Sequence, residues 1–205
     1  MKKILSIIFS SIFLMTSAYA GGMIGIKAGM GTLDGERTSD AKFGTESASK
    51  DHEYGAIFAE FEVGNSISIG AEYIPYEATI DTKASANVDS HANLSDHKTL
   101  YVLYPFADMF YAKAGYSHAD ASVVANYVNT TVTDAPDSIE GPMIGIGAQF
   151  ESPIPFLDVI RLEATYTDYG DMSITTTNAN GTTDTDTKKG KATQTTYTIG
   201  IAKSF

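Results

Sequence analysis

Seven charged residues occupy polar positions in segments where polar and apolar side chains alternate. They are Lys27, Glu60, Glu62, Glu72, Lys113, Arg161 and Glu163. Side chains of opposite charge that share an enclosed space can form a salt-bridge network that fills it, or they can line a path that selects ions. Three bases and four acids nearly cancel, as an enclosed set requires, because an unpaired buried charge has a high free-energy cost. Both interpretations stay open at the level of the sequence.

Four histidines, by contrast, fall in or next to the polar segments that connect the alternating ones. They are His52, His91, His97 and His118. Neutral imidazole binds metal ions and titrates near pH 6.5, so metal binding and proton sensing are the chemistries to consider. No pair has close ligand spacing such as HxxxH, and Asp184 and Asp186 alone are too few oxygen ligands for Ca²⁺. We therefore interpret the histidines as solvated connecting residues and predict neither a metal site nor a cofactor.

Histidine, serine and acid groups of the kind used in hydrolysis also occur close together. His118 lies two residues before Asp120, and His91 lies four residues before Ser95. Such combinations arise by chance in segments rich in Ser, Thr and Asp, so the sequence predicts no catalytic residue.

The composition limits the remaining options. The chain has 205 residues, a formal net charge of −11 and no cysteine, which fits one domain and excludes disulfides, thiolate zinc sites and a cysteine nucleophile. The acidic balance argues against a nucleic-acid partner. Mean hydropathy is −0.08, and no run of about 18 apolar residues follows the N-terminus, so a helical membrane span is not expected.

The first twenty residues are typical of an export signal. Lys2 and Lys3 precede a short uncharged apolar stretch, and Ala18 and Ala20 form a small-x-small cleavage site. We predict a cleaved signal peptide over residues 1–20 and a mature chain over 21–205. The apolar stretch is too short for a membrane anchor.

The mature chain is dominated by period-2 alternation, which is typical of strands with two different faces. We predict eight strands: Met23–Leu33, Tyr54–Val63, Ile67–Tyr76, Lys98–Tyr104, Met109–His118, Met143–Phe150, Val159–Tyr169 and Thr193–Phe205. Long and short connections alternate along the chain, so all long ones lie at one end of the sheet. Pro75 cannot donate to a ladder, and we expect it where the third strand passes into a loop.

The distribution of residues between the two faces predicts which face is enclosed. Most of the strand glycines share the polar face, and a narrow eight-stranded barrel needs small residues inside. On the apolar face only Lys203 is charged. A polar interior and an apolar exterior are the arrangement of a barrel that stands in lipid.

Aromatic residues on the apolar face sort into two belts. Phe61, Phe110, Phe150 and Phe205 lie at the short-turn end, and Tyr73, Tyr116, Tyr166 and Tyr197 lie at the long-connection end. At a rise of roughly 3.3 Å per residue and a tilt of roughly 40°, the belts are about 15–20 Å apart. We predict that they mark the two membrane interfaces.

The chain ends in TYTIGIAKSF, which places Tyr197, Ile199, Ile201 and Phe205 on one face. This resembles the C-terminal signature of bacterial outer-membrane barrels and implies recognition by the outer-membrane assembly machinery. Lys203 departs from the signature, because an aromatic or apolar residue is usual there, and we expect it to snorkel to the headgroups. The whole mature chain resembles the small eight-stranded barrels of the OmpA/OmpX type and the opacity proteins.

The resemblance implies an all-β fold, an eight-stranded antiparallel up-and-down transmembrane β-barrel in the bacterial outer membrane. We predict a non-enzymatic monomer with a structural or surface-interaction role, in contact with membrane lipid and lipopolysaccharide. Its extracellular ligand would bind the long connections. In residues 34–53, 77–98, 118–140 and 168–191 there are 18 acids and 8 bases, which repels nucleic acid and lets divalent cations bridge to lipopolysaccharide phosphates. Two alternatives stay open: a small porin or solute channel, and a lipid A-modifying enzyme.

Overall fold

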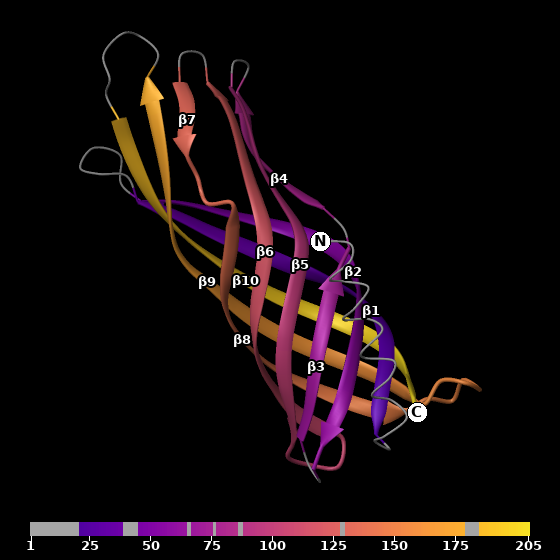
Figure 1. Ribbon diagram of the computed structural model, residues 1–205. Helices are drawn as coiled ribbons and strands as arrows, with labels where there is room; N and C mark the ends of the chain where they lie inside the picture. Colours follow the sequence, from indigo (N-terminus) through magenta and orange to yellow (C-terminus); the bar gives the residue numbers. More distant parts are fainter. Residues whose placement is uncertain are drawn as a thin grey trace, which may run out of the picture.

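A computed structural model describes residues 21–38, 45–64, 67–75, 77–85, 88–127, 130–178 and 185–205. The predicted signal peptide, residues 1–20, lies outside the described residues. The strands are β1 (Gly22–Thr38), β2 (Thr45–Val63), β3 (Ile67–Ile74), β4 (Ala78–Ser85), β5 (Val88–Pro105), β6 (Phe110–Tyr127), β7 (Thr130–Asp134), β8 (Ser138–Glu151), β9 (Val159–Asn178) and β10 (Thr185–Ser204) (Figure 1). Within these ranges no helix is long and apolar enough to cross a membrane.

The strands form one closed, all-antiparallel barrel, which confirms the predicted fold class. Ten strands occupy eight positions in the wall, because β3 and β4 share one position and β7 and β8 share another. Pro75 follows the end of β3, and Pro136 lies between β7 and β8, as expected for a residue that has no N–H for the ladder. The third strand therefore ends at Ile74, two residues before its predicted end.

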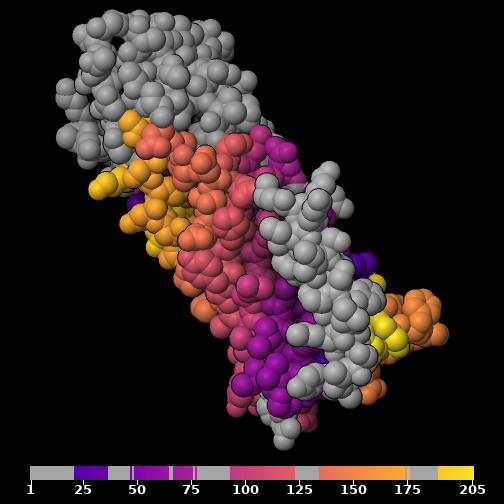
Figure 2. Space-filling model, viewed as in Figure 1, coloured from indigo at the N-terminus to yellow at the C-terminus, as the bar shows by residue number. Residues whose placement is uncertain are grey.

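The barrel closes between its first and last strands. β1 pairs with β10 from Met23 opposite Ser204 to Thr38 opposite Lys189. At the lower end, Gly22 and Phe205 exchange two backbone hydrogen bonds of 3.1 and 2.9 Å. The wall from β5 to β9 is continuous in the space-filling view (Figure 2).

The predicted long connections are wrong in extent, since most of their residues are strand. β1 and β2 stay in register up to Thr38 opposite Thr45, and β5 and β6 stay in register up to Val88 opposite Tyr127. Threonine is a good strand former, and tight hairpins need few turn residues. The polar composition that suggested loops belongs to strands that rise beyond the apolar band. The short turns and the long hairpins lie at opposite ends, as predicted (Figure 1).

The two faces are sorted as the alternation predicts. Large apolar side chains such as Ile26 and Leu100 are exposed on the outside, while Lys27, Lys113 and Arg161 are buried within. This distribution is the reverse of that in a water-soluble β-protein, whose apolar side chains lie inside. An exterior of this kind is stable only against another apolar medium.

Inward glycines make room for the aromatic rings of the lumen. Tyr101 lies directly across from Gly70, and Tyr111 lies directly across from Gly147. A Cβ atom at either glycine would overlap the ring of its neighbour. Each ring therefore covers the adjacent backbone, which explains why small residues share the polar face with bulky ones.

The pattern reverses at the upper end of the barrel, where an apolar cluster fills the interior. Its buried members are Ala119, Ile139, Tyr169 and Ala192, and Leu33, Leu94, Ala121 and Met172 pack against them. Strands that rise out of lipid into water need an apolar core inside rather than an apolar surface outside. The upper barrel therefore has the polarity of a soluble β-protein.

Candidate functional site

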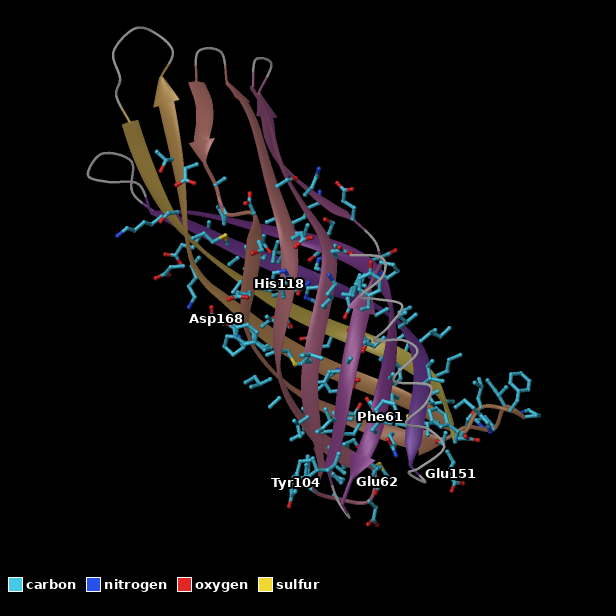
Figure 3. The ribbon with its side chains drawn as sticks, viewed as in Figure 1. Phe61, Glu62, Tyr104, His118, Glu151 and Asp168 are labelled. Atoms are coloured by element: carbon cyan, nitrogen blue, oxygen red, sulfur yellow. The ribbon has the colours of Figure 1, made fainter. Side chains whose placement is uncertain are left out.

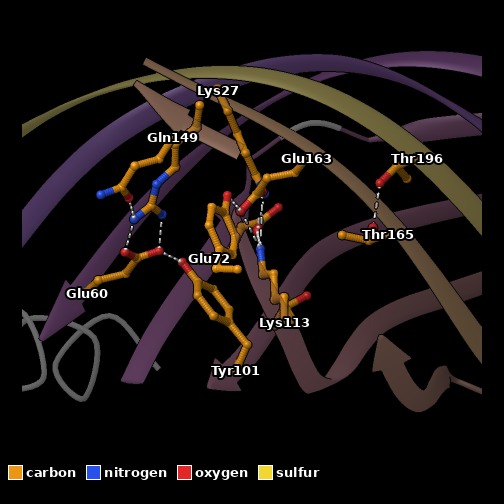
Figure 4. Close-up of polar contacts among 12 residues, drawn as sticks. Lys27, Glu60, Glu72, Tyr101, Lys113, Gln149, Glu163, Thr165 and Thr196 are labelled. Atoms are coloured by element: carbon orange, nitrogen blue, oxygen red, sulfur yellow. Dashed lines mark hydrogen bonds and ion pairs between the residues drawn. The ribbon is translucent and has the colours of Figure 1, made fainter. Parts of the chain in front are cut away.

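Six buried charges meet in the lumen and form a network of ion pairs and hydrogen bonds (Figure 4). One part of this ion-pair layer joins Arg161 on β9 to Glu60 on β2. The guanidinium binds both carboxylate oxygens, with Nη2 2.7 Å from Oε2. Tyr101 donates to Glu60 Oε1 at 2.7 Å, and Gln149 accepts from Arg161 at 3.2 Å. A carboxylate with three donors is well compensated for its burial.

The other part of the layer places two lysines between two glutamates. Lys27 Nζ lies 2.7 Å from Glu163 and also pairs with Glu72. Lys113 Nζ lies 3.3 Å from a carboxylate oxygen of each glutamate. Tyr111 donates to Glu163 at 2.8 Å. Because β1, β3, β6 and β9 each supply one charge, the cluster links four positions of the wall.

The layer is neutral, and its members are buried. Its three cations and three carboxylates have side-chain exposures of 8% or less. The space beside Phe58, Arg161 and Thr198 cannot hold a water molecule. An ion that entered would have to displace paired charges in a region of low dielectric constant, which is costly.

Glu62 is the one predicted lumen charge that the structure places elsewhere. Its side chain is exposed, and it lies two residues before the turn residue Gly64, beyond the packed interior. Figure 3 shows it at the short-turn end of the barrel. The alternation assigned its face correctly but could not show where the enclosed lumen ends.

A second polar layer lies above the first, and sequence reasoning missed it. His97 Nε2 lies 3.1 Å from the Tyr169 hydroxyl, which donates to Gln194 at 2.7 Å. The Gln194 amide lies 2.9 Å from His52 Nε2. Since the tyrosine has one proton, His97 must donate through Nε2, and His52 must accept. His52 is thus neutral, and burial lowers the pKa of His97 to about 4, so its neutral form predominates as well. Both histidines belong to the interior rather than to solvated loops.

This layer was missed because the predicted strands stopped short of His52 and His97, and two bulges lie beside it. Asp96 has a φ of 54°, and the register of β5 shifts between Ser95 and Lys98. The register of β10 shifts between Lys191 and Thr193, opposite Gly170, which has a φ of 70°. A bulge inserts one residue and changes which alternate residues point inward. Above these points, alternation carried on from the strand below therefore assigns side chains to the wrong face.

The aromatic residues of the two predicted belts lie on the outer face. Tyr197 is 60% exposed and Tyr116 is 50% exposed, and at the lower end Phe205 is 48% exposed. Phe61 and Tyr73 are half-buried. Of the predicted C-terminal residues, Ile199 also points outward, at 55% exposure.

The remaining candidate residues are exposed or external. Lys203 pairs with Asp158 at 2.9 Å, a contact that the snorkelling prediction did not include. His118 lies outside the barrel, 3.2 Å from Asp120 and 3.6 Å from Glu140 (Figure 3). The side chain of His91 lies outside the described set. Among the described residues, no three His, Asp or Glu side chains are arranged to hold a metal ion.

Comparison with known proteins shows which solved structures share this fold. No protein-family model matches the chain, and no curated protein does. Among solved structures, the outer membrane protein OprG from Pseudomonas aeruginosa is 15% identical, with a TM-score of 0.64 over 91% of this chain and 96% of that one. The outer membrane protein AlkL, solved in DMPC bilayers, is 12% identical, with a TM-score of 0.59 over 92% of each chain. The chain therefore shares the fold of small outer-membrane barrels.

Replacing one member of the Arg161–Glu60 pair should destabilise the barrel. In R161M, Glu60 loses its buried counter-charge, and we expect the free energy of unfolding to fall by about 3–5 kcal/mol. The double variant R161M/E60Q removes both charges and should recover most of this loss. Urea unfolding in lipid vesicles, followed by tyrosine fluorescence, measures all three proteins.

The exposed pair of Lys203 and Asp158 provides the control. K203M removes a solvent-accessible ion pair, which contributes no more than about 1 kcal/mol. If R161M were as stable as K203M, the ion-pair layer would not contribute to stability as described.

The upper layer predicts a loss of stability in acid. Burial lowers the pKa of His97 to about 4, whereas a histidine in an unfolded chain has a pKa near 6.5. Between these values the unfolded chain binds more protons, so this contribution is complete above about pH 6.5 and is lost as the pH falls towards 4. Burial also lowers the pKa of His52, which acts in the same direction.

The variant H97Q tests this assignment, because glutamine forms hydrogen bonds but does not titrate. When the pH is lowered from 7 to 4.5, the urea concentration at the unfolding midpoint should decrease for the native protein. It should decrease clearly less for H97Q. Equal slopes for the two proteins would show that His97 is not buried in its neutral form.

Proposed function

We propose that this chain is an integral outer-membrane protein whose closed barrel presents an extracellular interaction surface, and that it is neither a porin nor an enzyme. The observation that carries the proposal is the neutral ion-pair layer. Arg161 and Glu60 on one side, and Lys27 with Glu163 on the other, pair with each other rather than with a passing solute. The lumen is thus built to be rigid and closed.

The exterior supports a position in lipid. Exposed apolar side chains such as Ile144 and Ile199 lie between the phenylalanine and tyrosine belts, as the apolar band of an outer-membrane barrel requires. The fold is that of two outer-membrane proteins. In this orientation the long hairpins stand outside the cell, where their excess of acids would take up divalent cations that bridge to lipopolysaccharide phosphates.

We also propose that residues 1–20 are removed on export and that the last strand is the assembly signal. The Gly21 carbonyl accepts a hydrogen bond from Glu62 N at 2.9 Å, so the residue after the proposed cleavage site is already bound to the barrel wall. Tyr197, Ile199, Ile201 and Phe205 belong to the segment that closes the barrel against β1.

N-terminal processing is measurable on the protein extracted from outer membranes. The intact mass should correspond to a chain that begins at Gly21. A full-length mass in the membrane fraction would contradict the proposed cleavage.

Conductance separates the proposed function from a small porin. In planar bilayers the native protein should give no stable, ion-selective openings at neutral pH, because the paired charges close the lumen. Reproducible single-channel steps that vanish in a boiled sample would contradict the proposal and favour the porin.

A further inference from the structure

The second strand rises far above its neighbour on one side. β2 pairs with β1 along nearly its whole length, from Thr45 to Phe61. Its pairing with β3 begins only at Ile57, opposite Tyr73. The next strand, β4, pairs with β5. Among the described strands, none pairs with the outer edge of β2 over residues 45–56, and we call this segment the β2 edge.

The geometry of the barrel explains the gap. The β1–β2 hairpin follows β10, while the β4–β5 hairpin follows β6, so the two hairpins diverge above the upper tyrosine belt (Figure 1). Because Tyr73 marks that belt, the β2 edge lies on the side of the long hairpins, beyond the apolar band.

An unpaired edge presents alternating N–H and C=O groups that can pair with another strand. Proteins usually protect such edges with proline, bulges, short length or charged side chains, above all lysine, which repel a strand of like charge. The β2 edge has no proline, and its register with β1 has no shift. Lys50 is its only lysine. Its other charged residues are acids, so the edge is open to a strand of opposite charge.

The surrounding charge indicates the kind of strand that fits. Asp51 and Glu53 on β2 are exposed, and so are Asp34 and Glu36 on the adjacent β1. Among the side chains that the structure describes in these two segments, Lys50 is the one exposed base. A second copy of the same edge would oppose like charges, which destabilises a strand pair. An extended segment that carries Lys or Arg is complementary.

We propose that the β2 edge binds an extended, cationic peptide segment by strand addition. Backbone hydrogen bonds supply the affinity, and the four carboxylates select positive side chains. This inference rests on the proposed function, because it requires the long hairpins to stand outside the cell.

Backbone methylation provides the sharpest test. The full mature protein in lipid nanodiscs is titrated with a fluorescent nine-residue peptide of alternating Val and Lys. Two further peptides carry N-methyl groups at the odd or at the even positions. In an added strand only alternate N–H groups face the partner strand, so one methylated peptide should bind at least tenfold more weakly while the other keeps its affinity.

Equal binding of all three peptides would show attraction by charge alone and would overturn the proposal. Absence of binding by the unmodified peptide would overturn it as well. Neither result affects the closed lumen, which the conductance measurement tests independently.

A charge variant gives a second measurement. D51N/E53Q should weaken binding of the unmodified peptide several-fold. The control E151Q removes an exposed acid at the opposite, short-turn end of the barrel (Figure 3) and should leave the affinity unchanged. An equal loss of affinity in both variants would show that the peptide does not bind at the β2 edge. Gel mobility before and after boiling confirms that each variant is folded.

Discussion

Charge neutrality inside a narrow barrel is the constraint on which the rest of the structure depends. A barrel with an apolar exterior turns its polar side chains inward, and those side chains then lie in a space of low dielectric constant. Each of the three enclosed carboxylates therefore needs a cation at short range. Arg161 satisfies Glu60, while Lys27 and Lys113 satisfy Glu72 and Glu163. These pairs join strands distant in sequence, so the register of the wall and the pairing of charges require each other.

Much of this arrangement follows from the sequence, because alternation has a direct physical meaning. A residue such as Lys27 between Ile26 and Ala28 must lie on the face opposite to them. The same reasoning assigned all seven predicted charges to the lumen, and six of them are buried there. The outward direction of Tyr116 and Tyr197 follows in the same way. Which carboxylate meets which cation could not be predicted, since it depends on how four separate strands approach one another.

The upper barrel shows where such reasoning ends. The bulges at Asp96 and Gly170 change the face of the wall on which the residues above them lie. Nothing in the composition of these segments predicts a bulge. Above these points the strands are rich in Ser, Thr and Asp rather than apolar residues, so their composition predicts loops instead of strands. His97 and His52 consequently appeared solvated, although they join Tyr169 and Gln194 in a layer across the lumen. In water the same wall needs an apolar interior, and Ile139 and Ala192 provide it.

Access to the lumen tests most directly whether the paired charges close it. Ser117 lies between the two polar layers, is 1% exposed and is 2.9 Å from Thr99. Because the chain has no cysteine, S117C introduces a single thiol, and S47C introduces one at an exposed position of β2. With a small charged methanethiosulfonate reagent on the folded protein in liposomes, S117C should react at least a hundredfold more slowly than S47C. Comparable rates would show an open lumen and contradict the account.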